Sequence, residues 1–122
     1  MSIYATIAIS VVIFLHTAFL ILEMFLWNTP FGRKTFGLSQ EYAKKSAKLA
    51  ANQGLYNGFL AAGLLWGLVS TGGFDALVFF LSCIIIAGIY GGITVKRSII
   101  WIQAIPAIIA MILLVMPHLQ PY

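Results

Sequence analysis

Four long apolar stretches, separated by short segments that hold most of the charged residues, constrain this chain more than any other feature. A helix that crosses a hydrocarbon core roughly 30 Å thick needs about 20 apolar residues. Each stretch has about this length and stops near turn-forming residues such as Pro30 or Pro117. The pattern predicts an all-α fold, an integral membrane bundle of four transmembrane helices, in one domain covering residues 1–122. The expected spans are residues 3–27, 47–69, 74–95 and 99–116.

Composition supports lipid rather than water as the solvent. Hydrophobic residues make up 61% of the chain and charged residues only 8%, whereas soluble domains carry about 25% charged residues. The net charge of +4 would suit nucleic acid, but the basic residues occupy short loops, so no nucleic-acid partner is expected. Cys83 is the single cysteine, so neither an internal disulfide nor a cysteine-based zinc site is predicted, and no metal site is expected. The first stretch lacks a basic leader and cleavage site, which predicts a retained helix.

The distribution of lysine and arginine predicts how the chain sits in the membrane. The N-terminal tail, the second loop and the C-terminal tail contain neither residue. With four spans, the first and third loops share one side, and the positive-inside rule puts that side in the cytoplasm. We therefore expect a multi-pass protein of the plasma (inner) membrane, with both termini outside, its basic loops cytoplasmic and membrane lipids as partners. The seven cations are Arg33, Lys34, Lys44, Lys45, Lys48, Lys96 and Arg97.

Two further patterns predict local structure. Ser39 is a suitable cap for a helix that begins at Gln40, with Glu41 placed to pair with lysines one turn later. Pro106 lies within the last stretch and frees a backbone carbonyl near Ile102, which predicts a kink beside Gln103.

Glycines spaced four residues apart allow close approach of helices. This spacing favours packing within the chain at least as well as a homo-oligomer formed through the glycine-rich faces. The three pairs are Gly54 and Gly58, Gly63 and Gly67, and Gly88 and Gly92.

Polar side chains within the apolar stretches mark a candidate site, because ionisable and amide groups are costly in lipid and usually face a bundle interior. His16 and Glu23 are seven residues apart, so two helical turns place them on one stripe, about 10 Å apart along the axis. We expect the polar groups to converge on a cavity open toward the cytoplasm or inner leaflet. Glu23 and His16 are the candidate catalytic residues, and the candidate ligand-binding residues are Asn52, Gln53, Tyr56, Asn57, Tyr90 and Gln103.

These groups also have a purely structural interpretation. Amides and tyrosines commonly bridge membrane helices without any further role. Glu23 favours a function more strongly, because no lysine or arginine lies deep in a span to pair with it. The carboxyl group must be protonated or be held by the amides and His16. His16 alone could ligate a haem, but no cofactor is specified by the sequence.

Several motifs resemble the domain-of-unknown-function 1304 family, small membrane proteins of bacteria and fungi. They are His16, the run from Leu22 to Trp27, the stretch from Ala51 to Gly63, Ala87 to Gly91, and Gln103 with Pro106 and Ala107. The sequence Asn52-Gln53-Gly54-Leu55-Tyr56-Asn57-Gly58 is the most specific of them. The resemblance covers nearly the whole chain and implies four spans, but it implies no activity.

Three functions remain open from the sequence. The first is a membrane-embedded site that binds a small lipophilic molecule, with or without isomerising or hydrating it, in which Glu23 acts as acid and base and His16 orients it or shares its proton. The second is a proton-coupled exporter of small molecules, in which protonation of Glu23 competes with substrate. The third is an accessory or structural subunit whose polar core fixes helix packing. Whether the protein is an enzyme is not decided by these residues.

Overall fold

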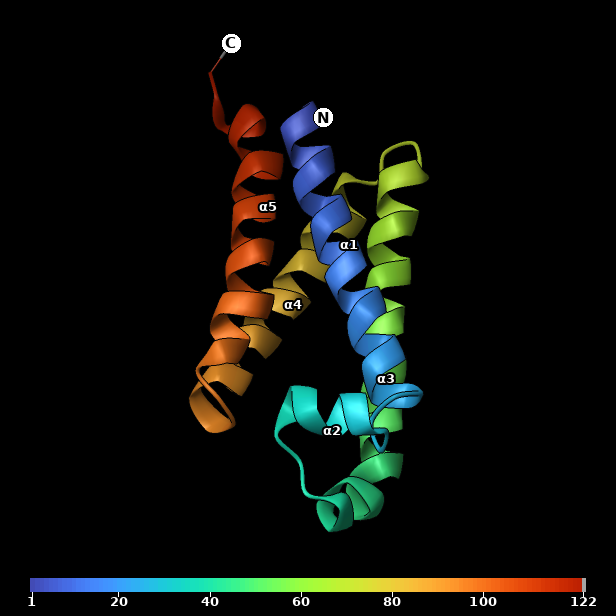
Figure 1. The fold of residues 1–122 in the computed structure, drawn as a ribbon. Helices are drawn as coiled ribbons and strands as arrows, with labels where there is room; N and C mark the ends of the chain where they lie inside the picture. The colour runs from blue at the N-terminus through green and yellow to red at the C-terminus, as the bar shows by residue number, and fades with distance from the viewer. Residues whose placement is uncertain (122) are drawn as a thin grey trace.

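The computed structural model describes residues 1–121, which are helical apart from short connections and contain no strand. The prediction of an all-α fold is thus confirmed. Figure 1 shows the order of the elements along the chain. They are α1 (Ile3–Met24), α2 (Pro30–Phe36), α3 (Gln40–Val69), α4 (Phe74–Thr94), the π-helix η1 (Ile100–Ala104), α5 (Ile105–Val115) and the 3₁₀ helix η2 (Met116–Leu119).

Three helical segments are long and apolar enough to cross a membrane: Ile3–Met24, Phe74–Thr94 and Ile100–Leu119. Helix α3 contains the predicted second span, but its first half carries lysines and amides, Asn57 follows in its second half, and only residues 58–69 are uniformly apolar. Helix α3 is long enough to cross a membrane, because it has 30 residues; its polar first half is what separates it from the three apolar segments. Three such segments are what a multi-pass membrane protein requires.

The long helices pack around a shared core. Helix α1 contacts α3 and α5, while α4 contacts α3, η1 and α5. The start of α1, the α3–α4 turn and the end of α5 lie at one end of the molecule, and α2 lies at the other (Figure 1). Buried aliphatic side chains from all four long helical segments fill the space between them. This core comprises Ile9, Val12, Leu64, Leu77, Leu81, Ile84, Ala107, Ala110 and Leu114.

Each of the three glycine pairs packs against another helix of the same chain. A β-carbon at Gly54 or Gly58 would meet Leu20 on α1, and one at Gly63 would meet Phe80 on α4. Similarly, a β-carbon at Gly88 would lie 2.7 Å from the backbone nitrogen of Ala104 in η1. The interpretation of these glycines as contacts within the chain is confirmed, whereas a homo-oligomer stays a prediction.

The last predicted span is not one uniform α-helix. Residues 100–104 form a π-helix, in which the Ile105 N–H bonds to the Ile100 carbonyl, and the α-helix begins only at Ile105. Pro106 explains this change, because it has no N–H to donate and its ring excludes ordinary helical geometry behind it. The irregularity predicted beside Gln103 is therefore present, as a change of helix type that includes Gln103.

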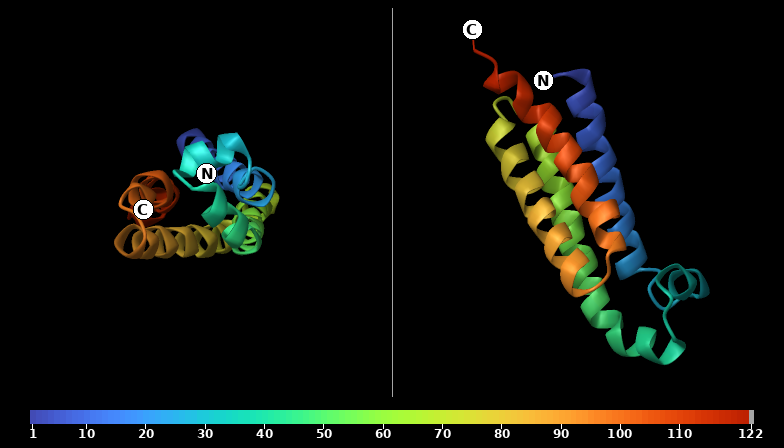
Figure 2. Two further views of the ribbon diagram at one scale, coloured as in Figure 1. Left: turned by 60° about the horizontal axis from the view of Figure 1, so that its bottom comes forward. Right: turned by 90° about the vertical axis from the view of Figure 1, so that its left-hand side faces the viewer.

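The segment after α1 corrects the expected end of the first span. Helix α1 ends at Met24 rather than Trp27, and a short helix, α2, follows that the sequence analysis does not predict. The Thr29 hydroxyl accepts the Gly32 N–H, and Gly37 ends α2 with φ of 66°, a conformation that glycine adopts without strain. Figures 1 and 2 show α2 lying across the direction of the long helices.

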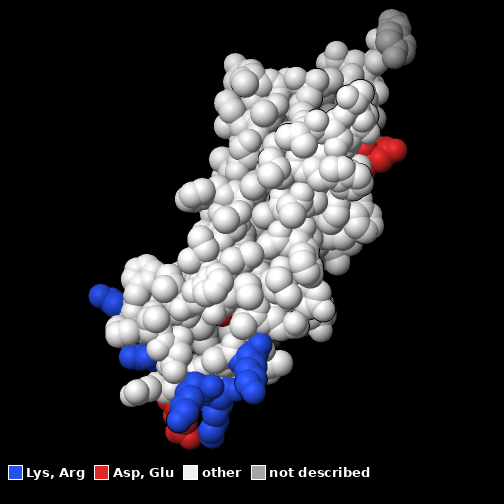
Figure 3. Space-filling model, turned by 90° about the vertical axis from the view of Figure 1, so that its right-hand side faces the viewer, with Lys and Arg blue, Asp and Glu red and all other residues white. Residues whose placement is uncertain are grey.

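The side chain of Trp27 connects α2 with the first turns of α3. The indole N–H of Trp27 donates to the Ser46 hydroxyl at 3.0 Å, and its ring packs against Phe36 with centroids 4.8 Å apart. The predicted start of α3 is confirmed, because the Ser39 hydroxyl accepts the Tyr42 N–H at 3.1 Å. Glu41 and Lys45 form an exposed ion pair at 3.0 Å. The basic residues gather at this end of the molecule, as the face in Figure 3 shows.

Candidate functional site

A hydrogen bond between α1 and α3 forms the centre of the candidate site. The Asn57 side-chain amide donates to Oε1 of Glu23 with nitrogen and oxygen 2.6 Å apart. Asn57 is buried and Glu23 is half-buried. Glu23 continues the stripe of α1 that contains the buried residues Ala5, Ile9, Val12 and His16. Its position on this stripe turns the carboxyl group toward the interior and toward α3.

Gly54 brings the two backbones close enough for this bond. A β-carbon at residue 54 would lie 3.0 Å from Cβ of Glu23 and 3.1 Å from the carbonyl oxygen of Leu20. Gly54 precedes Asn57 by almost one helical turn, so both residues share the buried face of α3. The glycine and the amide thus act together, one by allowing the approach and the other by donating to the carboxyl group.

No cation neutralises Glu23 within residues 1–121, where the only ion pair joins Lys45 and Glu41. The amide is its one hydrogen-bond donor in this part of the chain. A carboxyl group that is neither paired with a cation nor fully enclosed can exchange a proton or bind a polar group that approaches it. The catalytic role expected of Glu23 stays a prediction.

His16 makes its hydrogen bond within α1 rather than to Glu23. The imidazole is fully buried, with Nδ1 2.9 Å from the carbonyl oxygen of Val12 and its edge against Phe19, ring centroids 5.3 Å apart. Nε2 is buried and meets no hydrogen-bonding partner among residues 1–121. His16 therefore shares the stripe with Glu23 but makes no hydrogen bond to it.

The remaining predicted residues do not join this centre by hydrogen bonds. Tyr56 and Tyr90 are 54% and 70% exposed, which places both rings on the outer surface of the protein. Asn52 and Gln53 are also exposed, and Gln103 is half-buried on the π-helix. The structure thus brings together Glu23 and Asn57, with His16 on the same side of α1. The other five predicted binding residues face the surroundings wholly or in part.

Phe19 is a neighbour of the site that the sequence analysis does not identify. It follows His16 by three residues and precedes Glu23 by four, so it lies between them on the stripe. Its ring is half-buried. The helical spacing was the available signal, but an aromatic residue in an apolar span does not stand out by composition.

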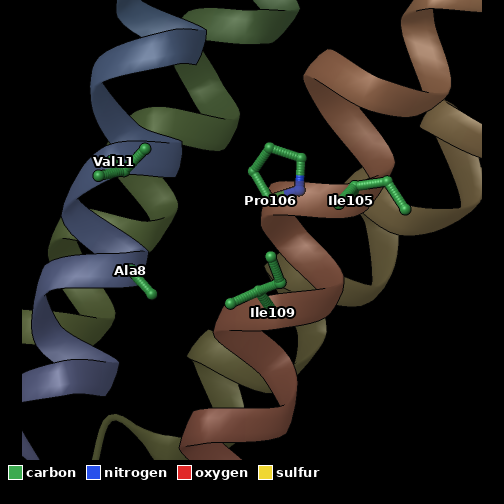
Figure 4. Close-up of a pocket in the computed structure, with 5 residues that line it drawn as sticks. All are labelled: Ala8, Val11, Ile105, Pro106 and Ile109. Atoms are coloured by element: carbon green, nitrogen blue, oxygen red, sulfur yellow. The ribbon is translucent and has the colours of Figure 1, made fainter.

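A groove between α1 and α5 lies beyond His16, away from the basic end. It has a volume of about 250 Å³ and is lined by Ala8, Val11, Ile105, Pro106 and Ile109. Figure 4 shows the Pro106 ring directed into the space between the two helices. All five side chains are apolar, so the groove can hold hydrocarbon but offers no polar side chain of its own.

Comparison with known proteins places the sequence in a family. Residues 10–115 match the family described as protein of unknown function (DUF1304). The chain belongs to the DUF1304 family. A curated relative, the uncharacterized protein YpaA of Lactococcus lactis subsp. lactis (strain IL1403), is 30% identical over 111 residues, covering 88% of this chain and 93% of the relative. No solved structure matches the chain.

The DUF1304 match confirms the resemblance seen in the sequence. The matched range contains Glu23, Asn57, Gly54 and His16. Neither the family description nor the relative's name assigns an activity.

Proposed function

We propose that this DUF1304 protein is a four-span membrane protein that binds a small lipophilic molecule through the polar group formed by Glu23 and Asn57. The observation that carries the proposal is the 2.6 Å hydrogen bond between them. It holds a half-buried carboxyl group that has no cationic partner in the described chain, on a helix apolar enough to cross a membrane. Such a group can recognise the polar end of a molecule that arrives through lipid.

The proposed topology follows from which end of the molecule each long helix begins and ends at. Helix α3 joins the basic end of the molecule to the end that carries the α3–α4 turn (Figure 1), so it accompanies α1 and α4 along their length. If α1, α4 and the segment from η1 to η2 cross a bilayer, α3 crosses with them and its Asn57 is covered by α1. The basic end then faces the cytoplasm of the plasma membrane by the positive-inside rule.

Thiol labelling tests this orientation. In a Cys83→Ser background, Thr71→Cys in the α3–α4 turn is expected to react with a membrane-impermeant maleimide on intact cells. Thr35→Cys in α2 is expected to react only after the cells are opened. The measurement is the extent of labelling before and after lysis. Labelling of Thr35→Cys on intact cells would reverse the proposed orientation.

The same carboxyl group would supply acid–base chemistry if the bound molecule reacts. A protonated Glu23 can give its proton to one atom of the ligand and, as carboxylate, accept one from another atom, which is the proton balance of an isomerisation. Hydration would add a water molecule and use Glu23 as the base or acid for it. Asn57 would keep the carboxyl group oriented throughout.

Substitution of Glu23 tests the binding proposal. Protein purified gently from membranes is analysed by native mass spectrometry and lipid extraction, beside Glu23→Gln and the control Glu41→Gln. A small molecule should accompany the wild type and the Glu41 variant and be lost from the Glu23 variant. The control removes an exposed carboxylate that lies outside the proposed site. It therefore shows the effect of losing one negative charge alone.

Two other outcomes favour the alternative functions. Proton release on binding of a cationic molecule, abolished in Glu23→Gln, would favour a proton-coupled exporter. If wild type and Glu23→Gln carry equal amounts of bound small molecule and differ only in stability, the result would favour an accessory or structural subunit. In such a subunit the hydrogen bond merely fixes α1 against α3.

A further inference from the structure

The orientation of the His16 ring determines which of its nitrogens carries hydrogen. Nδ1 lies 2.9 Å from the Val12 carbonyl oxygen, and a carbonyl oxygen can only accept a hydrogen bond. Nδ1 therefore donates, and in the neutral imidazole Nε2 presents a lone pair. This nitrogen is a buried acceptor without a donor among residues 1–121.

A buried acceptor without a donor is unfavourable, and few occur in native proteins. A phenylalanine or leucine at residue 16 would fill a similar volume in the apolar stripe without this cost. His16 is fully enclosed, so lipid headgroups and bulk water do not compensate for the missing donor. A polar group that donates a hydrogen bond to Nε2 would remove this cost.

The position of His16 connects it with the proposed ligand site. It lies two helical turns from Glu23 on the same stripe of α1, with Phe19 between them. Val11 lies five residues before His16 and so faces another side of α1, where it lines the apolar groove shared with α5. A molecule that passes Glu23 and displaces the half-buried Phe19 ring would reach Nε2.

We infer that Nε2 of His16 accepts a hydrogen bond from the bound molecule, which is therefore a neutral lipophilic alcohol rather than a ketone or ether. This inference rests on the proposed function and specifies its ligand class. Nε2 of His16 and the carboxyl oxygens of Glu23 offer acceptors, while the Asn57 amide already donates to Glu23. A hydroxyl group supplies the donor that the site lacks, whereas a carbonyl or ether oxygen would leave Nε2 unpaired.

Nuclear magnetic resonance of histidine nitrogen provides a direct test. The chain has two histidines, so labelling with ¹⁵N-histidine gives few signals, and His118→Gln identifies those of His16. The protein in lipid nanodiscs is titrated with 1-octanol and with 1-methoxyheptane, a chain of similar length that can accept but not donate. Octanol should shift the Nε2 resonance of His16 and bind about tenfold more tightly than the ether; the ether should leave the resonance in place.

Variants separate this inference from the proposed function. His16→Phe should bind octanol and ether equally, while His118→Gln should keep the tenfold preference. Should octanol binding depend on Glu23 while the Nε2 resonance stays unmoved, the proposed function stands and the role of His16 is wrong. Equal affinities of the wild type for octanol and ether would also overturn the role of His16. So would an Nε2 chemical shift that already indicates a hydrogen bond without octanol and does not change when octanol is added, because the donor would then be water. Failure of both probes to bind the wild type would exclude the alcohol class, whereas the proposed function is judged separately on the molecule that accompanies the purified protein.

Discussion

Gly88→Val is expected to lower the free energy of unfolding by at least about 1–3 kcal/mol, the usual range for overpacked cores. A β-carbon at residue 88 would lie 2.7 Å from the backbone nitrogen and 3.0 Å from Cα of Ala104. Backbone atoms of a neighbouring helix cannot rotate away, so α4 and η1 would have to separate. Circular dichroism during denaturation with sodium dodecyl sulfate measures the loss.

Gly91→Val is the matched control on the same helix. A β-carbon there would first meet the side chain of Ile99, with Cγ2 3.2 Å away and no neighbouring backbone within 4 Å. Ile99 is half-buried and can move, so the expected loss is much smaller. Equal losses in the two variants would show that Gly88 does not set the distance between α4 and η1.

The sequence predicts the helices better than their ends and connections. Long apolar stretches determine where α1, α4 and the last span occur, because the pattern depends only on length and composition. Helix α2 escapes prediction because seven residues that contain a proline and end at a glycine are typical of a loop as well as of a capped helical turn. Pro106 indicates a disturbed helix, but the sequence does not distinguish a kink from the π-helix that the structure has over residues 100–104.

The candidate site shows the same division between periodicity and tertiary arrangement. Helical spacing alone places His16 and Glu23 on one stripe, as the structure has them. Residues 52–57 contain four polar side chains within two turns of α3, so some must face away from α1 whichever face is buried. Only Asn57 shares the buried face with Gly54. Nothing within the sequence decides that choice, because both Asn52 and Asn57 are followed by glycines that could approach another helix.

Asn57→Leu is expected to cost about 1–3 kcal/mol of the free energy of unfolding, because it leaves the half-buried Glu23 carboxyl group without its donor. Asn52→Leu makes the same chemical change at an exposed position of the same helix, where effects within about 0.5 kcal/mol are usual. Thermal unfolding in detergent, followed by circular dichroism, compares the two. Similar losses in both variants would contradict a role for the hydrogen bond in holding α1 against α3.

Removing both partners should be less harmful than removing one. In Glu23→Met combined with Asn57→Leu, no polar group is left unpaired, so the double variant should be more stable than Asn57→Leu alone. Interhelical hydrogen bonds in membrane proteins show coupling energies of about 0.6 kcal/mol on average and about 1.7 kcal/mol at most. The unfolding measurements must therefore resolve a coupling energy of this size between Glu23 and Asn57. The double variant should nevertheless fail to retain the small molecule. Stability recovered while binding is lost would separate the two roles of this hydrogen bond, because packing tolerates an apolar pair whereas recognition of a polar ligand requires the carboxyl group.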